Sequence, residues 1–325
     1  MKRILFFTVL QSFFLICKAQ ENVSVSEIFF ADPTVFYENG RYYLTGTQNS
    51  QTLGFAVLQS ENLKEWSVPD GSQQQMILEK GTRSYGDNGF WAPQIFKTDS
   101  LYYLTYTANE QTVIAKSENL TGSYTQDMVE PVDGSEKNID SYLFRDDDGK
   151  YYFYHVRFNR GNFLWVAEFD IHTRKIVPST LARCFINTEA WETTPNYPSD
   201  PIMEGPTVIK LKGKYYMFYS ANHFMNIDYA MGYATSDSPM GPWEKHPSNP
   251  VIHRLIVGEN GSGHGDIFEG PGERLYYVYH VHFSNDQVSP RRTRIVPLSF
   301  NFNQEKGIYD ISADAGKIIV PVIKK

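Results

Sequence analysis

A short aromatic phrase recurs five times along the 325-residue chain and constrains its fold more than any other feature. Each copy holds two adjacent tyrosines, with glycine or a polar residue two positions before the pair. The pairs begin at residues 42, 102, 151, 215 and 276, at intervals of 49 to 64 residues. Aromatic and β-branched runs of this length, bounded by turn residues, are typical of strands and too short for helices. The chain therefore predicts five similar units built from short strands.

A second phrase precedes each tyrosine pair by 10 to 12 residues and leads into a short apolar stretch. Each unit then reads as strand, tight turn, strand, with one distinctive residue at the start of the first strand. These five residues are Asp32, Trp91, Asp140, Glu204 and His264. Several units add a third element that ends on an aromatic residue, which we expect to be the loop into a third strand. Its aromatic residues are Trp66, Tyr124 and Trp243.

Repeats of roughly 40 to 60 residues, each with about four short antiparallel strands, are what a β-propeller requires. One unit cannot bury both of its faces, so the units stack around an axis and exclude water between them. A β-sandwich would give no reason for five copies of the same two phrases. The 22 tyrosines and 22 phenylalanines also favour strands over a helix bundle. We predict an all-β protein, a five-bladed β-propeller that forms a single domain over residues 20–325.

The first residues have the pattern of an export signal: a basic start, an apolar run, and Ala19 at a small-residue cleavage point. We predict a signal peptide over residues 1–19 and a periplasmic or extracellular protein. The apolar run is short for a membrane anchor. Lipoprotein anchoring through Cys17 is less favoured, because the bulky Ile16 precedes it. Cleavage would leave Cys184 without an intrachain disulfide partner.

The formal charge of −7, with no basic block, argues against a nucleic acid as partner. No later segment reaches the length of a membrane span. We expect a monomer that has neither a nucleic acid nor a membrane as its partner.

In a propeller, the first strand of each blade lines the central channel, so the five first-strand residues should converge at one of its mouths. Removing a carboxylate from water costs several kcal/mol, on the order of the desolvation penalty of a buried ion, unless the carboxylate has a partner. Turn formation could account for one such residue, but not for three at equivalent positions. Glycoside hydrolysis uses one carboxyl group to protonate the leaving oxygen and another to activate water. A third carboxylate nearby raises the pKa of the acid. Trp91 would give a sugar ring an apolar wall.

These motifs resemble glycoside hydrolase family 43, the five-bladed inverting arabinofuranosidases, xylosidases and their relatives. The matching segments are residues 31–35, 90–93, 139–144 with 146–149, 204–206 and 263–265. The resemblance implies that Asp32 is the general base, Glu204 the general acid, and Asp140 the residue that tunes the pKa and orients substrate. Ser141 stands where the family usually has proline, and Gln94 where an acid is common. These departures alter a turn and contacts around the pocket, but not the three carboxylates.

Further substrate contacts are predicted beside this trio. Phe90 and His264 belong to the matching motifs, and His264 is either structural or a ligand of a Ca²⁺ or other ion in the central channel. The sequence shows no dense oxygen cage of the calcium type, and the chemistry itself needs no cofactor. Arg292 and Arg294 alternate toward one face of a predicted strand, where an arginine would hydrogen-bond sugar hydroxyls. A solvated basic strand is the alternative for these two.

The resemblance indicates the reaction better than the sugar. We expect an inverting glycoside hydrolase, exported to act on plant cell-wall polysaccharide or oligosaccharide that contains arabinose or xylose. An α-L-arabinofuranosidase is our first choice, with β-xylosidase, arabinanase or exo-galactanase as alternatives, and the sequence leaves exo or endo action open. A non-catalytic carbohydrate-binding propeller is the alternative of another class, but it should lack at least one of the three carboxylates.

Overall fold

The computed structural model describes residues 25–48 and 53–324, and in this part the chain is almost entirely β-structure. It has one α-helix there, the four-residue α1 (Arg254–Val257), and three short 3₁₀ turns. The predicted all-β class is confirmed. The predicted signal peptide lies outside the described residues. None of the helices in the described ranges is long and apolar enough to cross a membrane.

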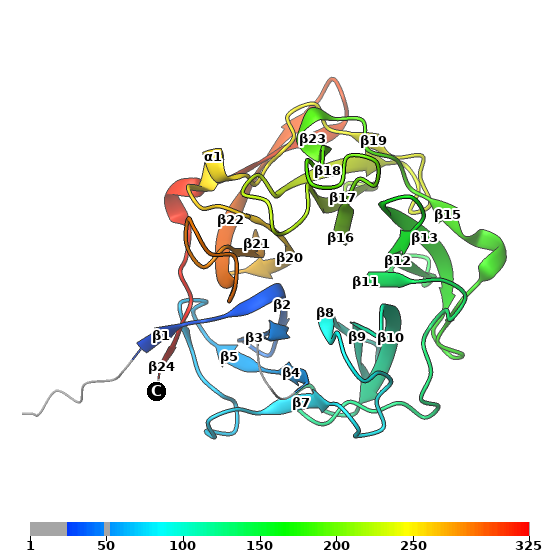
Figure 1. The fold of residues 1–325 in the computed structure, drawn as a ribbon, viewed down its shortest axis with the longest axis vertical. Coiled ribbons are helices and arrows are strands. Elements are labelled where there is room, and N and C mark those ends of the chain that lie inside the picture. Colours follow the sequence, from blue (N-terminus) through cyan, green and yellow to red (C-terminus); the bar gives the residue numbers. More distant parts are fainter. Residues whose placement is uncertain (1–24, 49–52, 325) are drawn as a thin grey trace, which may run out of the picture.

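Five antiparallel sheets surround a common centre (Figure 1). We number them in chain order, and each begins with its innermost strand. Sheets 1 and 2 contain β2 (Phe30–Glu38), β3 (Arg41–Gln48) and β5 (Leu58–Ser60), then β8 (Trp91–Lys97), β9 (Tyr102–Ala108) and β10 (Gln111–Ser117). Sheet 3 contains β11 (Asn138–Arg145), β12 (Tyr151–Phe158), β13 (Asn162–Asp170), β14 (Lys175–Ile176) and β15 (Ala182–Arg183). Sheets 4 and 5 contain β16 (Met203–Leu211), β17 (Lys214–Ala221), β18 (Ala230–Ser236) and β19 (Glu244–Lys245), then β20 (Gly263–Gly270), β21 (Arg274–Val281), β22 (Arg292–Asn303) and β23 (Ile308–Ala313).

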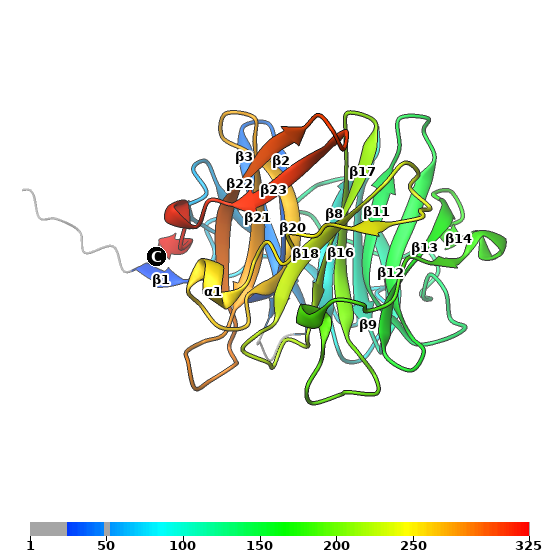
Figure 2. The same cartoon turned by 90° about the horizontal axis from the view of Figure 1, so that it is seen from above.

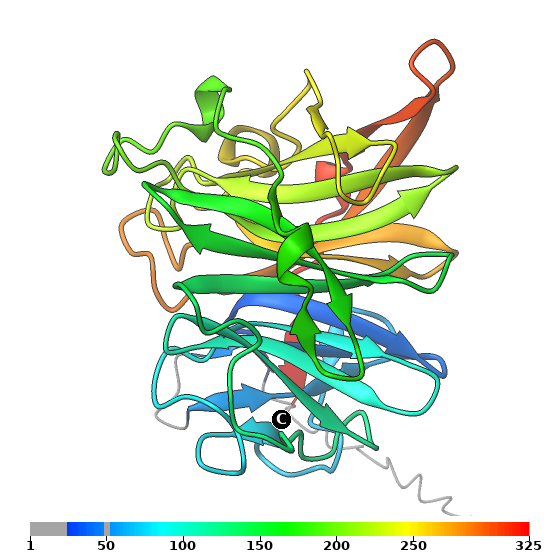
Figure 3. The same cartoon turned by 90° about the vertical axis from the view of Figure 1, so that its right-hand side faces the viewer.

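The innermost strands follow one another around a ring. Each of β2, β8, β11 and β16 contacts the innermost strand of the next sheet, and β20 contacts β2 again. Seen from the side, the sheets lie one above another (Figure 3). The loops between the second and third strands of sheets 4 and 5 project from one end of the ring (Figure 2). This arrangement agrees with the five repeated units of the sequence.

The tyrosine pairs occupy the second strand of each sheet, as the sequence predicts. Adjacent residues of a strand point to opposite faces, so each pair serves both neighbouring sheets. Burying an aromatic side chain of this size stabilises the fold by about 1.5–3 kcal/mol. At least one tyrosine of every pair is buried, namely Tyr42, Tyr103, Tyr152, Tyr216 and Tyr277, with Tyr215 buried beside its neighbour.

The third recurring element lies one strand later than we predicted. It follows the third strand, and its end returns to pair with that strand's outer edge, as Thr125 does with Lys116 and Glu244 with Thr235. The prediction was wrong because the third strand contains no tyrosine pair, so the repeated sequence pattern did not reveal it. The aromatic residues of the element, Trp66, Tyr124 and Trp243, are buried.

The two ends of the described chain pair with each other. Strand β1 (Val25–Glu27) is antiparallel to β24 (Val322–Lys324), which also runs parallel to β6 (Glu65–Trp66). The C-terminal strand therefore joins the N-terminal strand to the outer part of the first repeat (Figure 1).

A bulge interrupts the first strand of every sheet at the same place, where the strand register shifts. The residue in the bulge has a left-handed backbone, with φ between +41° and +62°. A bulge bends the strand and re-aims its side chains. These five positions are Asp32, Ala92, Asp140, Gly205 and His264.

Side chains of the preceding sheet in the ring hold four of the bulges through hydrogen bonds. The backbone N–H of Asp140 donates to Thr107 Oγ1 at 3.0 Å, and that of His264 donates to Ser220 Oγ at 2.8 Å. The N–H groups of Asp32 and Ala92 donate in the same way to His280 Nδ1 and Thr47 Oγ1. Each acceptor belongs to the second strand of the preceding sheet, so the bulge geometry is built into the packing between sheets.

Candidate active site

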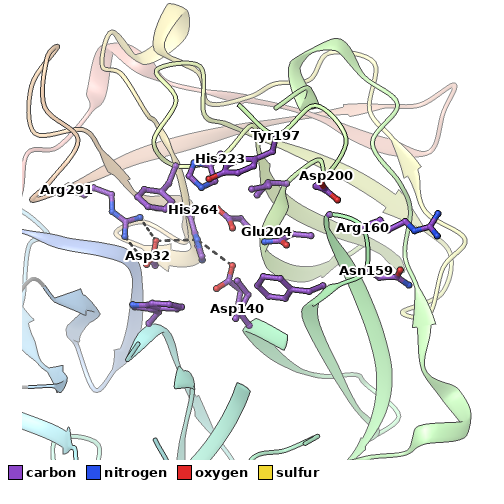
Figure 4. A pocket seen from close by; sticks show the side chains of 17 residues that line it. Asp32, Asp140, Asn159, Arg160, Tyr197, Asp200, Glu204, His223, His264 and Arg291 are labelled. Atoms are coloured by element: carbon purple, nitrogen blue, oxygen red, sulfur yellow. Dashed lines mark hydrogen bonds and ion pairs between the residues drawn. The ribbon is translucent and has the colours of Figure 1, made fainter. Parts of the chain in front are cut away.

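One cavity of about 620 Å³ receives all five predicted first-strand residues (Figure 4). Asp32, Asp140 and Glu204 line it, and each is only 5–8% exposed. His264 and Trp91 complete the set. The convergence expected from the repeats is therefore present in the structure.

Asp32 is held in its ionised form by a set of donors. Its Oδ1 lies 2.9 Å from Arg291 Nη1 and 3.3 Å from His264 Nδ1, and Thr47 Oγ1 donates to Oδ2 at 2.7 Å. Burial opposes ionisation, but the charges of Arg291 and His264 and the contact with His280 outweigh it. The pKa of Asp32 therefore lies well below its usual value, which suits a group that accepts a proton.

Asp140 and Glu204 have the opposite electrostatic environment. Burial, then repulsion from Glu204 and Asp32, raises the pKa of Asp140 well above its usual value. Burial raises the pKa of Glu204 to about 7 and the charge of Asp32 adds to this, although Tyr229 donates to Glu204 Oε1 at 2.8 Å. Repulsion between two carboxylates is mutual, so the pair titrates as a unit. The raised pKa values favour a proton on the Asp140–Glu204 pair near neutral pH, whereas the lowered pKa of Asp32 favours its ionised form.

The surroundings of position 205 explain why the Glu-Gly-Pro motif has a glycine there. The φ of Gly205 is +62°, and a Cβ there would lie 2.6 Å from Cδ2 of the His264 ring. The imidazole of His264 thus packs directly on the backbone next to Glu204. Any other residue at 205 would displace either the ring or the carboxyl group.

The predicted ion at His264 finds little support in the arrangement of side chains. The Nδ1 atom of His264 faces Asp32 at 3.3 Å and Asp140 at 3.9 Å. Within the residues that the structure describes, no group of three or more His, Cys, Asp or Glu side chains is arranged to hold a metal ion. We therefore derive no chemical step through an ion, and the ion stays an untested prediction.

The two aromatic residues predicted to contact substrate, Trp91 and Phe90, have different positions in the structure. Trp91 is 39% exposed and lines the cavity, where its indole can form a wall for a sugar ring. Phe90 does not line the cavity. It is 4% exposed and stacks on Tyr106 with ring centroids 5.7 Å apart, within the packing of the second repeat. Adjacent residues diverge here, and the prediction that Phe90 contacts substrate is wrong.

Arg292 and Arg294 also lie outside the cavity lining. Both form ion pairs with Glu259, and Arg294 Nη1 lies 2.9 Å from Glu27 Oε2. They belong to a structural network near the paired chain ends, so their predicted contact with sugar is wrong. The arginine beside Asp32 is their neighbour Arg291, which precedes β22 and therefore does not follow the alternation of that strand.

Three more residues that contact the carboxylates were not predicted from the sequence. Tyr229 donates to Glu204, Thr47 Oγ1 donates to the carboxylate of Asp32, and the ring Nδ1 of His280 accepts from the backbone N–H of Asp32. Thr47 and His280 follow their tyrosine pairs by four or five residues, at the far end of the second strand. That regular offset was the available signal. No regular spacing marks Tyr229.

Known proteins share this architecture. The family model described as Glycosyl hydrolases family 43 matches residues 22–304, which is most of the chain. The chain belongs to this family. It is a glycoside hydrolase, and the three carboxylates that line the cavity lie within the matched residues.

Individual relatives differ in the activities their names state. A solved endo-1,4-β-xylanase from Bacteroides thetaiotaomicron is 36% identical, with a TM-score of 0.84, and covers 94% of this chain and 100% of its own. A β-D-galactofuranosidase of Aspergillus niger is 25% identical over 87% of this chain and 82% of its own length. Xylosidase/arabinosidase 43B of Humicola insolens is 24% identical over 77% of this chain. The family 43 chain spans only 47% of that relative's length.

Proposed function

We propose that this family 43 protein is an exported, inverting glycosidase that releases sugar from arabinose- or xylose-containing glycans, with α-L-arabinofuranose as the preferred sugar. Its five sheets would act as the blades of a propeller that forms a single domain over residues 20–325. One observation carries the proposal: a single cavity gathers three buried carboxyl groups, with the pKa of Asp32 lowered and the pKa values of Asp140 and Glu204 raised. This is the division of labour that acid–base hydrolysis of a glycosidic bond requires.

In the proposed reaction, Asp32 takes a proton from water while that water attacks the anomeric carbon. Arg291 and Thr47 fix both oxygens of Asp32, so its orientation is set before substrate binds. Glu204 gives its proton to the leaving oxygen. Tyr229 then donates to the carboxylate that remains on Glu204 and stabilises its new charge. Asp140, beside them, contacts the bound sugar and keeps the proton on the pair.

The choice of sugar rests on the relatives. The names of two of them state action on a furanoside or an arabinoside. α-L-Arabinofuranose and β-D-galactofuranose share the five-membered ring that such a pocket would recognise. A β-xylosidase is the second candidate, because the names of other relatives state action on xylosides or xylan.

The stereochemistry of the product tests the mechanism, and a panel of aryl arabinofuranoside, galactofuranoside, xyloside and galactoside substrates tests the sugar. We expect fastest turnover of the arabinofuranoside. In an NMR time course, the first-formed sugar should have the inverted anomeric configuration, because a water between separated carboxyl groups attacks directly. Retention of configuration before mutarotation would contradict the roles given to Asp32 and Glu204.

Substitution of Asp140 by asparagine is expected to shift the pH profile. The alkaline limb reports loss of the last proton from the Asp140–Glu204 pair. Without the neighbouring carboxylate, Glu204 ionises more readily, so this limb should move to lower pH while kcat also falls. The measurement is kcat/KM against pH for D140N and wild type. An alkaline limb that stays in place or moves upward would show that Asp140 acts in substrate binding alone.

Export and oligomeric state complete the proposal. Residues 1–19 would be removed on export, leaving a monomer in the periplasm or outside the cell. The support is the sequence pattern of the first residues. N-terminal sequencing of protein recovered from the producing cell tests it, with Gln20 as the expected first residue.

A further inference from the structure

The cavity continues past Glu204, on the side away from Asp32. There it is bounded by the β12–β13 hairpin, residues 158–162, and by the segment that precedes β16 (Figure 4). Asn159 and Arg160 come from the hairpin tip, and Tyr197 and Asp200 from the segment. If Glu204 protonates the leaving oxygen, this end of the cavity receives the leaving part of the glycan.

Arg160 differs from every other arginine in the part of the chain that the structure describes. The other eleven each have an ion pair, a hydrogen bond or an aromatic ring as partner. Even the exposed Arg83 donates to a backbone carbonyl, and Arg183 lies over Phe163. Arg160 has none of these partners among the described residues, and it is exposed at the mouth of the cavity. An unpaired guanidinium presents several donors in a fork that fits a carboxylate.

The other basic groups of the cavity have a carboxylate partner or a lowered pKa. Arg291 pairs with Asp32 and lies over the Phe224 ring at 4.6 Å. Burial lowers the pKa of both His264 and His223. Arg160 is therefore the cation that remains for an anionic group of the substrate.

The position of Arg160 limits where that anionic group sits. Asp32, Asp140 and Glu204 crowd the reaction centre, so a carboxylate on the cleaved sugar would be repelled. The guanidinium of Arg160 points away from Glu204, toward the outer end of the cavity (Figure 4). An acidic group that Arg160 binds would therefore belong to the leaving part of the glycan, at the end of the cavity that Asp200 also lines.

We propose that the leaving-group end of the cavity binds a glycan that carries a uronic-acid carboxylate, and that Arg160 pairs with this carboxylate. The inference rests on the proposed function, because it takes Glu204 as the marker of the leaving-group side. It names the class of substrate for that site: an acidic, uronic-acid-substituted glycan, preferred over its neutral counterpart.

The test compares two pentose oligosaccharides that differ only in one glucuronic-acid substituent. Calorimetry measures their binding to E204Q, which should bind without hydrolysing them. We expect the acidic oligosaccharide to bind about 3–10-fold more tightly, as one partly exposed charge-assisted contact allows. This ratio should fall toward one in 1 M NaCl, where the screening length is about 3 Å. Adding R160Q to E204Q should abolish the preference, and adding R160K should restore part of it.

Arg145 provides a matched control, since it lies at the far end of β11 from Asp140 and R145Q makes the same charge change. E204Q with R145Q should keep the full preference. Equal binding of both oligosaccharides to E204Q, or a preference that survives R160Q, would overturn the inference while leaving the proposed function intact. Failure of the wild type to hydrolyse any glycoside of the panel would instead overturn the proposed function. If neither oligosaccharide binds to E204Q, the inference falls, and the hydrolysis panel alone decides the proposed function.

Discussion

Replacing Glu204 by alanine is expected to reduce hydrolysis of a natural oligosaccharide by about 10²–10⁴-fold, the usual contribution of a general acid. The loss on a nitrophenyl glycoside should be far smaller. A sugar alkoxide is a poor leaving group and needs the proton that Glu204 supplies, whereas a nitrophenolate departs without one. Steady-state kcat/KM on the two substrates gives the comparison.

The same experiment separates the acid from its neighbour. Asp140 lies in the same cavity and also has a raised pKa, so a proton on Asp140 is the rival donor. If Asp140 were the acid, D140A would show the leaving-group dependence and E204A would not. Equal losses on both substrates for both variants would mean that these carboxyl groups only bind sugar.

Replacing Asp32 by asparagine should abolish activity on both substrates, with a loss of at least about 10²–10⁴-fold on each. Both reactions need an activated water, and no better leaving group replaces it. The variant also leaves Arg291 without its buried carboxylate, which can cost about 3–5 kcal/mol of stability. Thermal unfolding of D32N must therefore accompany the kinetics.

Asp266 gives a matched control for Asp32. It is also a buried carboxyl group on a first strand, but it lies behind the active-site cavity and accepts from Thr34 Oγ1 at 2.6 Å. Burial raises its pKa to about 6. D266N should retain most activity. Appreciable turnover of the aryl glycoside by folded D32N would contradict the role of Asp32 as base.

The sequence was sufficient for the features that repeat. Five tyrosine pairs predicted the second strand of every sheet, because a strand packed on both faces needs large side chains on both. The three carboxylates were found because each stands at the start of a first strand. Because each lies at nearly the same distance from its tyrosine pair in sequence, all three occupy nearly equivalent positions around the ring.

The features that the sequence did not reveal depend on single-residue shifts. Trp91 and Glu204 were taken as equivalent to Asp32, yet the bulge residues of their strands are Ala92 and Gly205. Phe90 turns into the core beside an exposed Trp91. Arg291, just before β22, lies at the cavity and contacts Asp32, whereas the predicted contact with sugar was assigned to Arg292 and Arg294. The spacing of the sequence motifs does not reveal such shifts, because they follow from local backbone geometry.

The repeated bulges have a consequence for how binding energy is used. Four of the five left-handed positions hold residues other than glycine, at a cost of about 1–2 kcal/mol each. Packing between the sheets and the hydrogen bonds from the bulge N–H groups to neighbouring sheets offset that cost when the protein folds. Under the proposed function, Asp32 and Asp140 are thus oriented before substrate binds. The substrate's binding energy does not have to orient these two side chains, so more of it remains for distorting the sugar toward its transition state.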